Sequence, residues 1–171
     1  MNLEILKRGY FILYSNEGGL FGDAIERRQL KAGFSAESAN YTHVEVSGGG
    51  AYSVNISPPI SKLIKITERH KGRYIIVVRY KNLEYEQGKR HAVAYFSATL
   101  CNRGYDLKGV LSFIFKWIKQ SNRLWFCSEG ASWSLQMKFP EAGSYRVPSK
   151  WMPAHFYPNG EFEKVWEGRI L

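Results

Sequence analysis

Alternating and continuous apolar runs predict β-strands in the first half of the chain. Residues 10–14 form a short apolar run, which a polar, glycine-containing stretch closes. Residues 42–46 and 51–56 alternate around three glycines, a pattern typical of a β-hairpin. Residues 63–66 and 73–80 are two further β-runs, and the second is apolar enough for a central position in a sheet.

Helical spacing replaces the strand pattern in the second half. Val93, Phe96 and Leu100 mark one helix, and apolar residues repeat at helical intervals over residues 107–118, with Asp106 placed to cap that helix. Earlier in the chain, residues 20–30 suit a short helix, whereas the small polar residues 35–40 indicate a loop.

A third helix is predicted to begin at or just after Cys127 and to run toward Lys138, where Pro140 would stop it. The tail from residue 148 is aromatic and reads as loop-rich. With no internal repeat or linker, residues 1–171 indicate one α+β domain in which strands precede helices.

Composition narrows the class of protein. Hydrophobic residues make up 44% of the 171 positions, and no apolar run reaches the ~20 residues that a membrane-spanning helix needs. The N-terminus lacks the features of a cleaved signal, which favours the cytoplasm and leaves a cellular or a viral origin open. The net charge of +9 suits an acidic polymer, nucleic acid or anionic lipid, but the basic residues are dispersed, which favours a solvated surface.

Two cysteines, Cys101 and Cys127, are too few for a disulfide framework and lack zinc-ligand spacing. Cys127 falls at a predicted helix start, where the helix dipole favours a thiolate and free N–H groups can hold an oxyanion. Cys101 lies late in an apolar helical pattern, so we expect it to serve packing.

His43 is the best candidate for a base that activates Cys127. It lies within a predicted strand, which fixes its direction. The other histidines, His70, His91 and His155, lie in a charged turn, at a helix start and in a loop, where we expect solvent-facing or structural roles.

A third residue should orient the imidazole. If the hairpin turns at its three glycines, His43 lies opposite Asn55, whose side chain would then be about 5 Å away at Cβ. A longer loop would place Ser53 there instead, and Glu45 shares the face of His43. We rank Asn55 first, Glu45 second and Ser53 third.

These motifs together resemble the permuted papain-like amidases, the circularly permuted branch of the NlpC-type cysteine peptidase superfamily, with YiiX-like proteins the most similar. The matching segments, in chain order, are residues 10–14, residues 20–30, Thr42-His43-Val44, Arg103-Gly104-Tyr105-Asp106 and Cys127-Ser128-Glu129. Gly130 departs from the family, which usually has a bulky apolar residue there, and Asn55 stands where many relatives carry Glu or His.

The resemblance implies a papain-like α+β fold, with an antiparallel sheet or small barrel packed against helices. It also implies that Cys127 is the nucleophile, His43 its base and a polar residue near position 55 the orienting member, with no cofactor. We therefore expect a cysteine hydrolase that cleaves a peptide or acyl-amino bond through a thioester. Two alternatives remain, a thiol acyltransferase or esterase acting on lipid, and an inactive basic module that binds nucleic acid or an acidic polymer.

Overall fold

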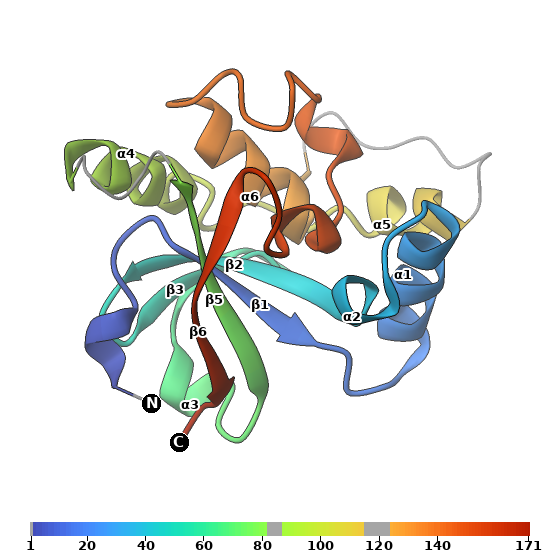
Figure 1. Ribbon diagram of the computed structural model, residues 1–171, viewed down its shortest axis with the longest axis horizontal. Helices are drawn as coiled ribbons and strands as arrows, with labels where there is room; N and C mark the ends of the chain where they lie inside the picture. The colour runs from blue at the N-terminus through green and yellow to red at the C-terminus, as the bar shows by residue number, and fades with distance from the viewer. Residues whose placement is uncertain (1, 82–86, 115–123) are drawn as a thin grey trace.

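The computed structural model describes residues 2–81, 87–114 and 124–171, and an antiparallel sheet is its central element (Figure 1). The sheet order is β4-β3-β2-β1-β5-β6 in these residues. The strands are β1 (Phe11–Ser15), β2 (Tyr41–Gly49), β3 (Tyr52–Asn55), β4 (Lys62–Lys65), β5 (Tyr74–Tyr80) and β6 (Phe162–Arg169).

Helices flank this sheet, so the described chain is a mixed α+β structure. The α-helices are α1 (Leu20–Lys31), α2 (Ala36–Ala39), α3 (Ile66–Arg69), α4 (Gln87–Ala98), α5 (Leu107–Ile114) and α6 (Cys127–Gln136). Three short 3-10 turns are η1 (Leu3–Ile5), η3 (Pro148–Lys150) and η4 (Pro153–Phe156).

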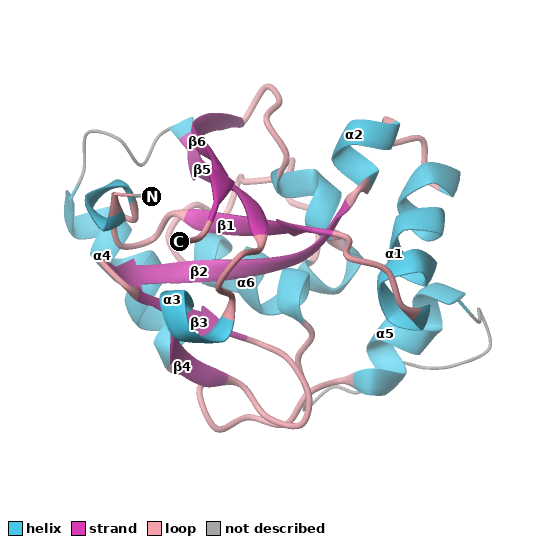
Figure 2. Cartoon of the chain, turned by 90° about the horizontal axis from the view of Figure 1, so that it is seen from below, coloured by secondary structure: helices cyan, strands magenta, loops and turns pink. Residues whose placement is uncertain are grey.

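The strands alternate between two buried faces, as their period of two residues requires. On one face, Phe11, Leu13 and Val44 pack with side chains of α6 and η4, and Figures 1 and 2 show α4 and α6 over this face. On the other face, Ile12 and Tyr14 pack with residues of α3 and β5. β1 is therefore completely buried, which explains its unbroken apolar sequence.

Most of the predicted elements are confirmed within the described residues. β1, α1, the β2–β3 hairpin, β4, β5, α4 and α6 fall on the predicted segments, and β5 has a partner on each side, β1 and β6. Asp106 does cap α5, since its carboxylate accepts the backbone N–H of Gly109 at 2.8 Å. The predicted end of that helix, beyond residue 114, lies outside the described residues.

Two expected loops contain regular structure instead. α2 interrupts the predicted loop at 35–40, because Ser35 caps it through a hydrogen bond from the N–H of Ser38. The tail contributes β6, which pairs antiparallel with β5 over most of its length. Its charged residues, Glu163, Lys164, Glu167 and Arg169, suit an edge strand.

Among the described helices, none combines the length and the hydrophobicity needed to cross a membrane.

Candidate active site

Cys127 is the first residue of α6, and its side chain is held against β2. Only 4% of the residue is exposed. Its sulfur accepts hydrogen bonds from the backbone N–H groups of Val44 and Ser128 and is also in hydrogen-bond contact with the His43 side chain. The first N–H groups of a helix have no acceptor within the helix, so Ser128 can donate to the sulfur.

The geometry of β2 explains why a strand amide faces this cysteine. β3 pairs with β2 only from the Val46–Val54 pair onward, so the outer edge of β2 at Val44 is not paired with β3. The N-terminus of α6 packs beside this free edge, where the amide of Val44 is available. This contact brings together Cys127 and the strand that carries His43, which are far apart in the sequence.

His43 and Glu45 share one face of β2, two residues apart. The Nε2 atom of His43 lies 3.3 Å from Oε1 of Glu45. The His43 side chain is 19% exposed, whereas that of Glu45 is fully buried. The imidazole therefore lies between a buried carboxylate and the Cys127 sulfur.

The carboxylate of Glu45 accepts hydrogen bonds on both oxygens. Oε1 also binds Nε2 of His70 at 2.8 Å, and Oε2 binds the hydroxyl of Tyr14 at 2.8 Å and that of Ser53. A buried carboxylate is tolerated only when such partners replace its water. These bonds thus fix the Glu45 carboxylate in the position where it contacts His43.

Electrostatics favour a thiolate–imidazolium pair. Burial would raise the pKa of the Cys127 thiol, but His43 and the two backbone N–H groups lower it more, and the net pKa lies below its ordinary value. Burial would lower the pKa of His43, but Cys127 and Glu45 raise it well above its usual range. Burial opposes ionisation of Glu45 too, yet hydrogen bonds from His43 and His70 hold its pKa far below normal.

The residue ranked first as the orienting member, Asn55, is not the partner of His43 in the structure. The hairpin pairs Val46 with Val54 and Ser47 with Ser53, so paired numbers sum to 100 rather than the predicted 98. The hairpin turns at Gly50 and Ala51, since Gly49 pairs with Tyr52, and an irregularity between Ser47 and Gly49 then shifts the pairing by one residue. Continued along the strand, this register brings Asn55 beside Glu45 instead of His43.

Asn55 is buried, but its Oδ1 has no hydrogen-bond partner in the described residues. It lines a separate pocket beside Pro58, Pro59 and Lys62. The second-ranked residue, Glu45, is the one in contact with His43, and the third, Ser53, binds Glu45 rather than His43.

His70 is the site residue that sequence reasoning missed. Its charged neighbours suggested an exposed turn, yet the residue is 7% exposed and its ring packs 4.4 Å from that of Tyr14, measured between centroids. It follows α3 directly, and α3 packs its Ile66 into the core. Only this long-range packing turns His70 inward, so no local pattern marked it.

The remaining candidates lie away from this cluster. His91 is exposed on α4. His155 lies on η4, where its ring accepts a hydrogen bond from the N–H of Met152. Burial, together with nearby Arg146, lowers the pKa of His155 to about 4. Cys101 is a partly buried free thiol beside Leu100, Val54 and Ile56, as expected of a packing residue.

The segment containing Gly104, Tyr105 and Asp106 supports the start of α6. Tyr105 forms a parallel bridge with Trp125, and the N–H of Asp106 donates to the carbonyl of Trp125 at 2.9 Å. These contacts fix the backbone two residues before Cys127. The motif is therefore structural support for the cysteine's position.

Glu129 reaches back to the start of α6, where its carboxyl accepts the N–H of Phe126. This is half of a capping box. Burial and the neighbouring Asp106 outweigh that hydrogen bond and raise the pKa of Glu129 to about 7. The helix N-terminus that carries Cys127 is thereby capped by an acid that ionises near neutral pH.

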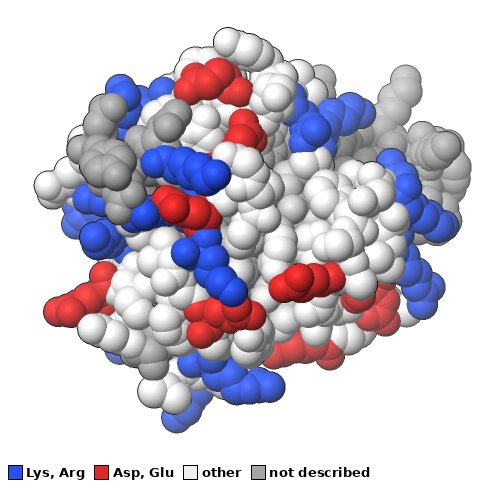
Figure 3. Space-filling view, in the orientation of Figure 1, with Lys and Arg blue, Asp and Glu red and all other residues white. Residues whose placement is uncertain are grey.

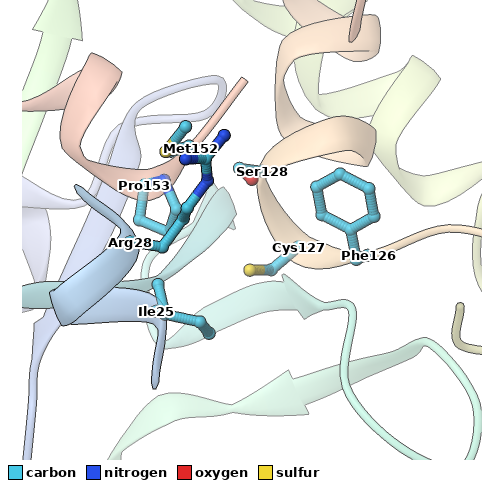
Figure 4. Close-up of a pocket in the computed structure, with 7 residues that line it drawn as sticks. All are labelled: Ile25, Arg28, Phe126, Cys127, Ser128, Met152 and Pro153. Carbon is cyan, nitrogen blue, oxygen red and sulfur yellow. The ribbon is translucent and has the colours of Figure 1, made fainter. Parts of the chain in front are cut away.

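A small pocket opens beside Cys127 between α1, α6 and η4. Figure 4 shows the cysteine sulfur directed toward α1, where Ile25 and Arg28 form the facing wall. The pocket is lined by Ile25, Arg28, Phe126, Cys127, Ser128, Met152 and Pro153. A substrate group bound next to the sulfur would contact these side chains.

Charges of both signs are spread over the molecular face in Figure 3, where Lys and Arg alternate with Asp and Glu. This arrangement matches the dispersed basic residues of the sequence.

Comparison with known proteins adds no relative: the chain matches no protein-family model and shows no significant similarity to any curated protein.

Proposed function

We propose that the protein is a cysteine hydrolase that cleaves an amide bond, with Cys127 as nucleophile, His43 as base and Glu45 as the residue that orients His43. The observation that carries the proposal is the continuous contact from the Cys127 sulfur through His43 to the buried carboxylate of Glu45. Nucleophile, base and orienting group in that order form the arrangement needed for covalent acyl transfer.

The proposed reaction begins with attack of the Cys127 thiolate on the carbonyl carbon of the amide. The carbonyl oxygen takes the electron pair, and N–H groups at the start of α6, which have no acceptor within the helix, stabilise that charge. As the carbon–nitrogen bond breaks, protonated His43 gives its proton to the leaving amine, and a thioester remains on Cys127.

Water then resolves the thioester. His43, now neutral, accepts a proton from the water that attacks the carbonyl carbon, and the carbon–sulfur bond breaks. The products are a carboxylic acid and the free Cys127 thiol, whose proton His43 returns or retains as the ion pair re-forms. No metal or redox group enters the balance.

Glu45 acts through His43. Because Glu45 contacts Nε2 of His43, Nδ1 is the ring nitrogen that remains to contact the Cys127 sulfur. The negative charge of Glu45 stabilises the imidazolium. We further propose that the sheet and α6 represent the permuted papain-like fold. This proposal rests on the order His43 before Cys127 and on a cysteine at a helix start facing a histidine on an antiparallel sheet.

A labelling experiment tests the proposed function. The Cys101→Ser protein is treated with a thiol-directed activity probe that carries an acyl-amide recognition element, and modification is mapped by mass spectrometry. We expect labelling at Cys127, loss of labelling in Cys127→Ala, and slowing of at least about tenfold in His43→Ala, because the imidazolium no longer supports the thiolate.

His91→Ala is the matched control, since His91 is exposed on α4 and should leave labelling unchanged. Equal labelling of Cys127 in the wild type and in His43→Ala, together with no turnover of any amide in a substrate panel, would overturn the proposal.

A further inference from the structure

We propose that Arg28 forms a carboxylate-binding subsite next to Cys127, so that the amide cleaved carries an anionic group close to the scissile bond. This inference rests on the proposed function, since it names the substrate class of the same site. Its basis is an arginine in the wall of the pocket that holds the nucleophile, for which the described part of the chain provides no ion-pair partner.

Arg28 lacks the partners that a half-buried arginine normally has. Its Nε is buried without a hydrogen-bond acceptor, and no carboxylate within residues 2–81, 87–114 and 124–171 forms an ion pair with it. A buried donor without an acceptor costs free energy, which a bound acceptor would recover. The guanidinium presents a planar set of donors that suits a carboxylate.

The pocket around Arg28 explains why that acceptor would belong to a substrate. Ile25, Phe126, Met152 and Pro153 give the pocket an apolar lining, and the Arg28 side chain extends along this wall so that its guanidinium lies next to Met152 (Figure 4). A hydrophobic recess with one fixed charged group is the usual form of a site that orients a ligand. An amide with an apolar part and a carboxylate matches both features.

Arg28 is also held by a rigid support. The next residue, Gln29, is completely buried and bonds to three backbone groups: its amide nitrogen donates to the carbonyls of Ala39 and Tyr41, and its oxygen accepts the N–H of Ala154. These bonds join α1 to α2, to β2, whose Val44 contacts the Cys127 sulfur, and to η4, which lines the pocket. The Arg28 backbone is thus fixed relative to Cys127, as a specificity residue requires.

Paired alkylating reagents test the charge beside Cys127 without knowledge of the natural substrate. Iodoacetate and iodoacetamide both transfer a carbon to the sulfur with loss of iodide, and they differ in the negative charge of iodoacetate. The ratio of their rates cancels changes in the nucleophilicity of the thiolate. In the Cys101→Ser background, we expect Arg28→Met to lower the iodoacetate-to-iodoacetamide ratio about tenfold and Arg28→Lys to lower it less.

Arg27→Met is the matched control, because Arg27 is the exposed neighbour on α1 and its loss changes the net charge equally. We expect that variant to change the ratio by less than about twofold, as solvent and salt screen exposed charges. An unchanged thermal midpoint and an unchanged iodoacetamide rate in Arg28→Met would show that the fold and the thiolate persist.

Amide substrates locate the carboxylate. N-hexanoylglycine and N-hexanoylglycinamide differ by a charge on the amine side, whereas N-succinylglycinamide and N-butyrylglycinamide differ by a charge on the acyl side. We expect kcat/KM for the anionic member of one pair to exceed that of its neutral partner by about tenfold, and Arg28→Met to remove that preference. The substrate pair whose kcat/KM preference depends on Arg28 identifies the side of the scissile bond on which Arg28 binds the carboxylate.

The outcomes separate this inference from the proposed function. If Arg28→Met and Arg27→Met change the reagent ratio equally and neither substrate pair depends on Arg28, the subsite is overturned even where His43-dependent labelling of Cys127 stands. If labelling is independent of His43 while the ratio still depends on Arg28, the anion subsite stands and the hydrolase proposal fails.

Discussion

Glu45 is a charged residue at a fully buried strand position, and neighbouring side chains replace the hydrogen bonds to water that burial removes. Four side chains bond to its two oxygens: Tyr14, His43, Ser53 and His70. Truncating one member of such a network leaves the others unsatisfied, so its residues are coupled in stability and in function. His43 alone among the four also contacts the cysteine.

At this scale we predict that Glu45→Gln slows modification of Cys127 by about tenfold or more, because a neutral amide no longer stabilises the imidazolium. Asn55→Ala should change the rate by less than about threefold, since Asn55 makes no hydrogen bond to His43. Rates of iodoacetamide alkylation in the Cys101→Ser background measure both effects. A larger effect from Asn55→Ala than from Glu45→Gln would restore Asn55 as the orienting residue.

The pH dependence of the same reaction follows from the lowered pKa of Cys127. The thiolate is the reactive form, so alkylation is fast above the pKa and falls as the pH drops through it. In the wild type this fall should occur below the ordinary thiol pKa of about 8.5.

In His43→Ala, burial remains and the opposing charge is lost, so the midpoint should move to higher pH. A pH–rate profile between pH 5 and 10 measures the shift, and coincident midpoints for the two proteins would contradict the ion pair.

At the scale of elements, α6 packs so closely on the residues that follow β3 and α4 that Gly130 has no room for a side chain. A Cβ at this position would lie 2.2 Å from Cδ1 of Ile56 and 3.0 Å from Cδ1 of Leu100. Ile56 thus fills the space that a bulky residue on the helix would occupy. A glycine at this position therefore has a packing cause.

We predict that Gly130→Ala lowers the free energy of unfolding by about 1–3 kcal/mol through overpacking, despite the higher helix propensity of alanine. Ile56→Val removes the clashing atom, so Gly130→Ala should cost less in that background. Urea denaturation of the four proteins measures the coupling. Gly88→Ala in α4 is the control, because open space surrounds Gly88 and the change should be neutral or stabilising.

At the scale of the whole molecule, Gln29 connects segments that are up to 125 residues apart in sequence. Gln29→Leu would leave the carbonyls of Ala39 and Tyr41 and the N–H of Ala154 without this partner. We predict a loss of about 2–5 kcal/mol in unfolding free energy, because several buried backbone groups lose their hydrogen bonds together.

Thermal and urea denaturation measure this loss, and Gln87→Leu, at an exposed position of α4, is the control. Equal stability of the two variants would show that Gln29 does not join α1 to the rest of the structure.

Local pattern predicted much of the fold and part of the site. The apolar run of β1, the helical spacing of α4 and the break before Cys127 each depend on neighbours in the chain, and each element forms where expected. The pairing of Cys127 with His43 also followed from the kinds of element that carry them. The error in register arose mainly because the hairpin turns at Gly50 and Ala51 rather than over its three glycines. The irregularity between Ser47 and Gly49 then shifts every later pair by one residue.

The sequence by itself determined most of the elements, the α+β class and the selection of Cys127 and His43 as candidates, because strand and helix periods and the properties of a helix terminus are local. Only the tertiary structure decided that Glu45 contacts His43, that His70 turns inward and that Arg28 lies beside the cysteine with no ion-pair partner among the described residues. These facts depend on the register of a hairpin and on the packing of α1 and α3, which arise from contacts between residues distant in the chain.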